Sequence, residues 1–446
     1  ATVADLSVEL QVEFARATAT VLGNAIGAIR QKQDEEATRW LKFWRLFGQL
    51  MLRAPVRGGR RGHAILPARF GAFAQGDFKR LVDWWQHDRA MLERRPKPDQ
   101  REQDKLTKRA VRLIGRFCLS KAARLLTSEG VADSADPRVR AQMDSKFPDR
   151  KAPLSSSLDQ FMPFDPPKGL PVRRVIGLQP RGTGTGPDGM RAEYFHALRL
   201  PYTCTHGRRG LQDFGEFADL FAANALPAWY YYAATAATLI PIIKEPNVNP
   251  AHAPDARPVQ MGNVETRIIG RSVTLHFHGD LADFYEPQQL GTTTKGGLDV
   301  LVNLVRMHLA ANPSHVCVKL DIRNMFNEIE RAAIIRVFEA NPSLRDMVPF
   351  LFAVHSPKSP VYYPDGQPAD KSCAEGTRQG APEAGYGATA PIQGPLQDAD
   401  AALAATGGFA RADFDDTYLC GVPAEVATAL VAFEAAIALV GAELQR

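Results

Sequence analysis

Two short segments place aspartates where they could bind a metal ion. Residues 316–321 alternate between apolar and polar side chains, which is typical of a half-buried strand, and Asp321 ends the polar face. Residues 409–420 form two strand-like arms around Asp415 and Asp416, which predicts a β-hairpin with acids at its tip. Adjacent carboxylates repel each other, and oxygen ligands suit Mg²⁺. Taken singly, Asp321 also fits a strand-end cap, and the Asp415-Asp416 pair also fits a solvated turn.

Other short motifs precede the aspartates or lie between them. Phe326 follows Asp321 by five positions, and the run 376–382 contains Arg378-Gln379-Gly380. Four elements lie further upstream. They are Gly186-Pro187-Asp188-Gly189, an apolar run ending at Lys244, Arg257-Pro258-Val259 and Gln289-Leu290-Gly291.

This order of motifs resembles the reverse transcriptases of non-LTR retrotransposons, from about residue 170 to residue 446. The resemblance implies an RNA-directed DNA polymerase with an RNA template, a DNA primer and deoxynucleoside triphosphates as partners. It also implies an α+β fold of right-hand polymerase type, with fingers and a ferredoxin-like palm sheet covered by helices. An all-α N-terminal region would precede them.

The resemblance assigns a role to each motif residue. Two Mg²⁺ ions would be held by Asp321 and Asp415, with Asp416 as a weaker ligand and the carbonyl of Ile322 as a further oxygen. In the substrate site, Lys244 and Arg257 would face the triphosphate. Gln379 and Gly380 would form a floor under the nucleotide, and the Phe326 ring would exclude a 2′-hydroxyl; Phe326 also fits a plain core position.

The chain departs from the family pattern at several positions. Asp413 stands where the family usually has an aromatic residue, and its strand parity with Asp415 predicts a third carboxylate in the cleft. Met325 and Ala381 also replace the usual residues. We expect the thumb to be absent and the chain to be a fragment, because its sequence stops before the lysine-bearing strand of the family. The alternative is a catalytically impaired retroelement remnant that acts at most as a nucleic-acid-binding module.

The elements that must position these residues fall into three regions of the 446 residues. Residues 1–150 are expected to be a helical, basic N-terminal region, residues 151–300 fingers and linker elements, and residues 301–446 the catalytic palm. Prolines make residues 128–171 look irregular and mark a boundary. The aromatic cluster from Trp40 to Phe47 is expected to be core.

Charge and cysteine spacing limit the classes of function. Basic residues gather between Arg53 and Arg124, a stretch that fits either a phosphate-binding surface or solvated helix faces. The five cysteines contain no C-x-x-C pair, which excludes a zinc finger and argues against a disulfide framework. An intracellular location, nuclear or cytoplasmic, is expected. Residues 220–243 carry no charge, but their prolines and tyrosines predict a buried helix and a short strand, so no membrane partner is expected.

Overall fold

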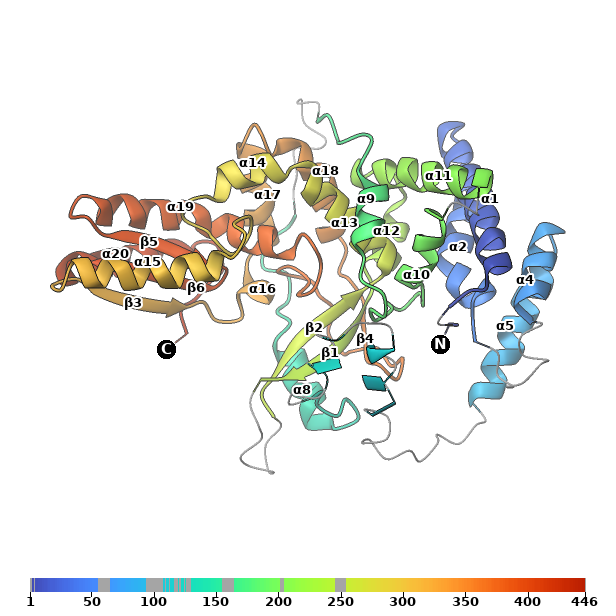
Figure 1. Cartoon of the computed structure of the whole chain (residues 1–446), viewed down its shortest axis with the longest axis horizontal. Helices are drawn as coiled ribbons and strands as arrows, with labels where there is room; N and C mark the ends of the chain where they lie inside the picture. The colour runs from blue at the N-terminus through green and yellow to red at the C-terminus, as the bar shows by residue number, and fades with distance from the viewer. Residues whose placement is uncertain are drawn as a thin grey trace.

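The computed structural model describes residues 2–445 with gaps at 4, 55–64, 94–106, 109, 112, 116–118, 120, 121, 124, 126–129, 155–163, 201–203 and 245–253. Most of the basic residues between Arg53 and Arg124 lie outside the described residues, so their surface stays a prediction. The described elements are mainly helices with two small sheets, and the predicted α+β class is confirmed (Figure 1).

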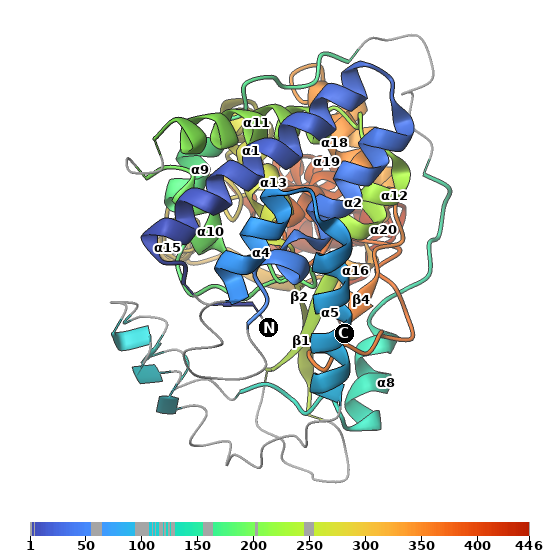
Figure 2. The same cartoon turned by 90° about the vertical axis from the view of Figure 1, so that its right-hand side faces the viewer.

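Four helices make up the described N-terminal part: α1 (Val8–Arg30), α2 (Asp34–Met51), α4 (Ile65–Ala74) and α5 (Phe78–Glu93). Helix α1 begins after Ser7, whose hydroxyl accepts a hydrogen bond from the Leu10 amide. One face of α1 packs along α11 (Cys204–Ala222), as Figure 2 shows. On α2, Trp44 and Phe47 are buried, which confirms that this aromatic cluster is core.

The first sheet has the strand order β2-β1-β4. Strand β1 (Ala237–Ile243) pairs antiparallel with β2 (Ala256–Gly262) and parallel with β4 (Val361–Tyr362). Helix α8 (Pro137–Ser145) lies beside this sheet, within a stretch that the sequence predicts to be irregular. That prediction is wrong here because Pro137 occupies the first turn, where a missing amide costs nothing, and Asp136 caps the helix.

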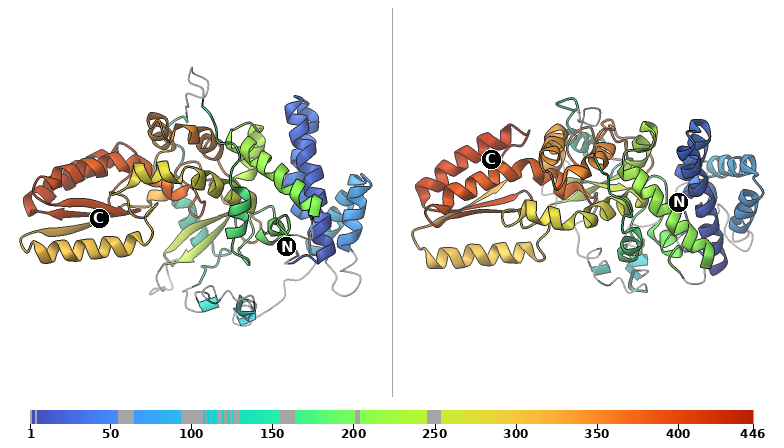
Figure 3. Two further views of the ribbon diagram at one scale, coloured as in Figure 1. Left: turned by 45° about the horizontal axis from the view of Figure 1, so that its top comes forward. Right: turned by 90° about the horizontal axis from the view of Figure 1, so that it is seen from above.

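The second sheet has the strand order β3-β6-β5. Strand β3 (Val316–Asp321) and the hairpin of β5 (Phe409–Asp413) and β6 (Asp416–Gly421) lie where the sequence predicts them. Helices α19 (Ala384–Ala404) and α20 (Pro423–Ala438) lie on one side of the sheet. Helix α15 (Gly297–Ala311) lies on the other (Figure 3).

Shorter helices connect the two sheets and the N-terminal helices. They are α9 (Val172–Leu178), α10 (Ala192–Ala197), α12 (Ala228–Ala234), α13 (Val264–His276), α14 (His278–Tyr285), α16 (Met325–Glu328), α17 (Arg331–Ala340) and α18 (Val348–His355). One apolar core extends from Leu6 to Ala442, and a smaller core lies between α8 and the first sheet. The molecule is elongated, with the second sheet and the N-terminal helices at opposite ends (Figure 1).

Residues 220–243 are divided among the end of α11, the short helix α12 and strand β1, as predicted. Within the described ranges, no helix is long and apolar enough to cross a membrane.

Candidate active site

Three aspartates form a row across one end of the second sheet. Asp321 ends β3 and is paired with Asp416 at the start of β6, and Asp416 is in turn paired with Asp413 at the end of β5. Residues directly opposite each other in a sheet point to the same face. The predicted strand parity of Asp413 with Asp415 is therefore wrong, because Asp415 belongs to the turn and Asp413 lies opposite Asp416, but Asp413 lines the same groove as Asp415, as predicted.

The turn that carries Asp415 is held by a buried glutamine. Phe414, at the turn, has φ of 56°, a conformation that costs a non-glycine residue about 1–2 kcal/mol. The Gln289 side chain accepts a hydrogen bond from the Phe414 amide at 2.8 Å and donates one to the Phe414 carbonyl at 3.2 Å. Gln289 is fully buried. Its two hydrogen bonds hold the turn in its strained conformation.

The aspartates line an open groove of about 1150 Å³ between the two sheets. Lys244 and Arg257 line the groove from the first sheet. Ile322, Phe326 and Gln379 complete the set of predicted site residues found there. Gly380 lines a second hollow of about 360 Å³, which shares Phe326, Gln379 and Phe414 with the groove. The structure thus brings the sequence-predicted residues together around two joined hollows.

Negative charge accumulates at the row of acids. Burial raises the pKa of Asp415, and the charges of Asp321 and Asp416 raise it further, while Arg257 opposes the shift. Burial and the charge of Asp416 also raise the pKa of Asp413. A cation in this groove would relieve that repulsion.

Lys319 already supplies one positive charge to the acids. It lies two positions before Asp321 on the same face of β3, and its ammonium is 3.0 Å from Asp416 Oδ1. This hydrogen bond raises the pKa of Lys319. Sequence reasoning placed Lys319 on the acid face but assigned it no role, because the pairing depends on the register between β3 and β6.

The groove offers oxygen atoms as possible metal ligands. Carboxylate and carbonyl oxygens are the preferred protein ligands of Mg²⁺, and the groove offers both. Gln445 donates a backbone hydrogen bond to the Asp321 carbonyl, and Glu443 accepts one from the Arg323 amide. Neither residue bonds to the Ile322 carbonyl, which lies between them. In the part of the chain that the structure describes, no three His, Cys, Asp or Glu side chains are arranged as a metal-binding group. The donor atoms are of the kind that Mg²⁺ prefers, and Lys319 would compete with a metal ion for one oxygen of Asp416.

The Arg378-Gln379-Gly380 turn is fixed against the first sheet. The Gln379 carbonyl accepts a hydrogen bond from the Gln260 amide of β2 at 2.8 Å. Gly380 has φ of 115°, and a Cβ there would lie 2.8 Å from the Gln260 carbonyl oxygen, so only glycine fits. Arg378 points away into the core, where it pairs with Glu383 at 2.8 Å and donates to the Thr235 carbonyl. Its role is to anchor the turn.

Asp255 pairs with two lysines that line the groove. Asp255 lies 3.0 Å from the Lys146 ammonium and 3.6 Å from that of Lys244. Partial burial acts in the opposite direction, but the hydrogen bond and charge of Lys146, with the charge of Lys244, lower the pKa of Asp255. Lys146 also lines the groove, although no motif in the sequence points to it.

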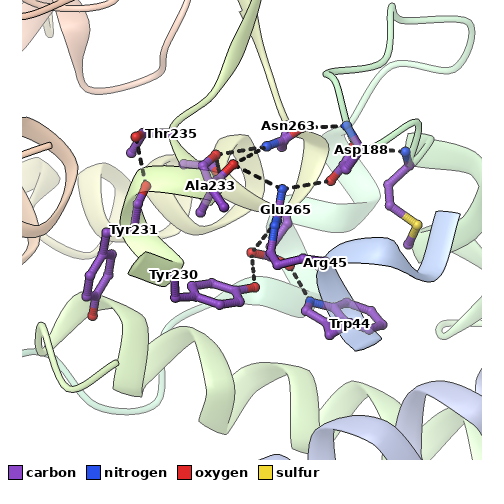
Figure 4. Close-up of polar contacts among 12 residues, drawn as sticks. Trp44, Arg45, Asp188, Tyr230, Tyr231, Ala233, Thr235, Asn263 and Glu265 are labelled. Carbon is purple, nitrogen blue, oxygen red and sulfur yellow. Dashed lines mark hydrogen bonds and ion pairs between the residues drawn. The ribbon is translucent and has the colours of Figure 1, made fainter. Parts of the chain in front are cut away.

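The Gly186-Pro187-Asp188-Gly189 motif serves a buried ion network instead of the groove (Figure 4). Arg45 of α2 lies 3.5 Å from Asp188 and 3.3 Å from Glu265 of α13. Tyr230 donates to Glu265 at 2.8 Å, and Trp44 donates to the same carboxylate. Burial raises the pKa of Glu265 and of Asp188. The network joins the N-terminal helices to the helices that support the first sheet.

Comparison with known protein families identified no family model that matches this chain. The geometry of the groove is therefore the basis for any functional proposal.

Proposed function

We propose that this chain is the RNA-directed DNA polymerase domain of a non-LTR retroelement, with the first sheet in the fingers and the second in the palm. The observation that carries the proposal is the acid row of Asp321, Asp416 and Asp413, with Asp415 at the adjoining turn, facing Lys244 and Arg257 across one groove. Carboxylates on one wall and cations on the other suit a triphosphate whose phosphates are bound through both.

Each residue has a defined task in this proposal. Asp321, Asp415 and Asp416, with the Ile322 carbonyl, would hold two Mg²⁺ ions, which when bound activate the primer hydroxyl and stabilise the leaving pyrophosphate. Lys244 and Arg257 bind the triphosphate oxygens. The Gln379-Gly380 backbone supports the nucleotide, and Phe326 limits the space beside its sugar. Lys319 neutralises Asp416 until a metal ion takes its place.

A second candidate is a catalytically impaired remnant that binds nucleic acid. Two observations favour it: Asp413 adds a further carboxylate to the acid row, and Lys319 is paired with Asp416. An extra acid repels the primer phosphates and removes the ring that the family usually places there. The two candidates share one fold and differ in turnover.

Primer extension separates the two candidates. The full chain is given an RNA template, a DNA primer, deoxynucleoside triphosphates and Mg²⁺, and is compared with Asp415→Ala and with Asp413→Tyr. Asp398→Ala is the matched control, because Asp398 is an exposed carboxylate on α19 that does not line the groove. We expect extension by the unchanged chain and by Asp398→Ala, and a loss of about 10³-fold or more in Asp415→Ala.

Two other outcomes of this assay would decide against an active polymerase in the unchanged chain. Extension only after Asp413→Tyr would show that the remnant candidate is correct and that Asp413 is its defect. If the unchanged chain, Asp398→Ala and Asp413→Tyr all fail to extend the primer while their circular dichroism shows them folded, the polymerase proposal is wrong for this chain.

A further inference from the structure

Two cysteines lie directly opposite each other on neighbouring strands of the second sheet. Cys317 of β3 is paired with Cys420 of β6, although the two residues are far apart in the sequence. Directly opposed side chains share one face, with Cβ atoms about 4.5–5.5 Å apart and Cα atoms within the range that a disulfide spans. The strand register therefore assembles a dithiol that cysteine spacing in the sequence does not reveal.

The two thiols differ in exposure and in acidity. Cys420 is fully buried, whereas Cys317 is partly exposed. The interaction between the two thiols lowers the pKa of Cys317 and raises that of Cys420, and burial acts to raise both. The reachable sulfur is thus the better nucleophile, because the thiolate is the reactive form of cysteine.

We propose that Cys317 and Cys420 form a redox modification site, a dithiol that a low-molecular-weight disulfide converts reversibly to a cross-strand disulfide. The Cys317 thiolate attacks one sulfur of the small disulfide, forms a mixed disulfide and releases one small thiolate. The Cys420 sulfur then attacks Cys317, and the Cys420 proton leaves with the second small thiolate. Two protein thiols are oxidised, and one small disulfide is reduced to two thiols.

The new bond would change the spacing of the strands. A disulfide holds Cβ atoms about 3.8 Å apart, closer than opposed positions on free strands, so it draws β3 toward β6. The Asp321–Asp416 pair lies four residues further along the same two strands, about 13 Å away. A bond formed under such constraint remains readily reducible.

The test needs no enzymatic activity and uses the unchanged full chain. The reduced protein is equilibrated in buffers of varying glutathione to glutathione disulfide ratio, its free thiols are alkylated, and it is digested with trypsin without reduction. The five cysteines fall in five different tryptic peptides, with Cys317 in residues 307–319 and Cys420 in residues 412–446. We expect these two peptides to appear joined, 2 Da lighter than their sum, in a single transition that dithiothreitol reverses.

Two variants sharpen the result. Cys317→Ser should abolish the joined peptides and leave Cys420 alkylatable after unfolding. Cys373→Ser is the matched control, because Cys373 is equally buried but contacts Arg331 and Gln260 instead of a second cysteine. It should leave the transition unchanged. Recovery of Cys317 and Cys420 as separately alkylated peptides at every ratio would overturn the proposal, as would glutathione on Cys317 without a cross-link.

Discussion

At the scale of single residues, the groove is organised by charges that the fold holds close together. Asp413 and Asp415 both have a raised pKa, so the folded chain binds protons at these sites more tightly than the unfolded chain. Their contribution to stability is therefore present below about pH 4 and is lost as the pH rises through the raised values. At neutral pH the acids destabilise the fold in the absence of a cation.

This repulsion predicts that Asp415→Asn stabilises the cation-free chain at neutral pH. We expect the free energy of unfolding to rise by roughly 0.5–1 kcal/mol at pH 7, because a partly buried negative charge is removed. Near pH 4 and below, the gain should disappear as the aspartate becomes protonated. Thermal unfolding at both pH values measures the difference. A variant that is less stable than the unchanged chain at pH 7 would contradict this account.

Phe326 gives a second prediction at the same scale. Its ring lies 6.3 Å from that of Phe414 and lines both hollows. Under the proposed function, Phe326→Ala opens space beside the sugar and should raise the incorporation of ribonucleotides relative to deoxynucleotides by about tenfold or more. Phe284→Ala removes a half-buried ring outside the groove and is the control. Unchanged sugar selectivity in an active Phe326→Ala enzyme would exclude the steric role.

At the scale of elements, the turn between β5 and β6 depends on the segment before α15. Gln289 is fully buried, and its amide group bonds both to the amide and to the carbonyl of Phe414. Backbone bonds from Leu290 to Ala412 and from Ala412 to Gln288 align the same segment with β5. The Gln289-Leu290-Gly291 motif thus positions the hairpin without entering the groove.

We therefore predict that Gln289→Ala weakens both the fold and the turn. Loss of the two hydrogen bonds leaves the partly buried Phe414 backbone groups unpaired, which should lower the free energy of unfolding by about 1–3 kcal/mol. Amide hydrogen exchange should accelerate most at Phe414 and its neighbours. Gln288→Ala is the control, since Gln288 bonds through its side chain to Asp400 of α19 and not to the turn. Equal exchange at Phe414 in both variants would refute the positioning role.

Sequence reasoning succeeded for elements whose signal is local. The alternation of residues 316–321 predicted β3, and the two arms around Asp415 and Asp416 predicted the hairpin. Sequence reasoning failed where the position of a side chain depends on how two distant segments pair. The parity of Asp413, the ion pair of Lys319 and the bonds of Gln289 all depend on register between strands, which a single sequence does not specify.

At the scale of the whole molecule, the N-terminal helices share their core with the rest of the chain. Phe47 of α2 is fully buried beside Phe14 of α1, and the same apolar core continues as far as Ala442. The Arg45–Glu265 ion pair adds a buried polar link between α2 and α13. These contacts predict that the helices and the groove unfold together.

Phe47→Ala tests this coupling. A cavity in the shared core should cost about 3–5 kcal/mol and shift one cooperative transition, seen identically by near-ultraviolet circular dichroism and by hydrogen exchange in α19. Leu46→Ala is the matched control, because the Leu46 side chain, next to Phe47 in the sequence, is 44% exposed. A Phe47→Ala transition that leaves α19 protected would mean that the helices form an independent unit.

The ion pair between Lys319 and Asp416 also determines how the groove responds to its surroundings. Lys319 acts as a competitor tethered to the chain, so its local concentration at Asp416 is set by the length of its side chain, on the order of millimolar or above for a short tether. Dilution of the protein leaves that concentration unchanged. Under the proposed function, a free cation would compete with the ammonium by mass action, so its occupancy of Asp416 would follow the concentration of the cation and not that of the protein.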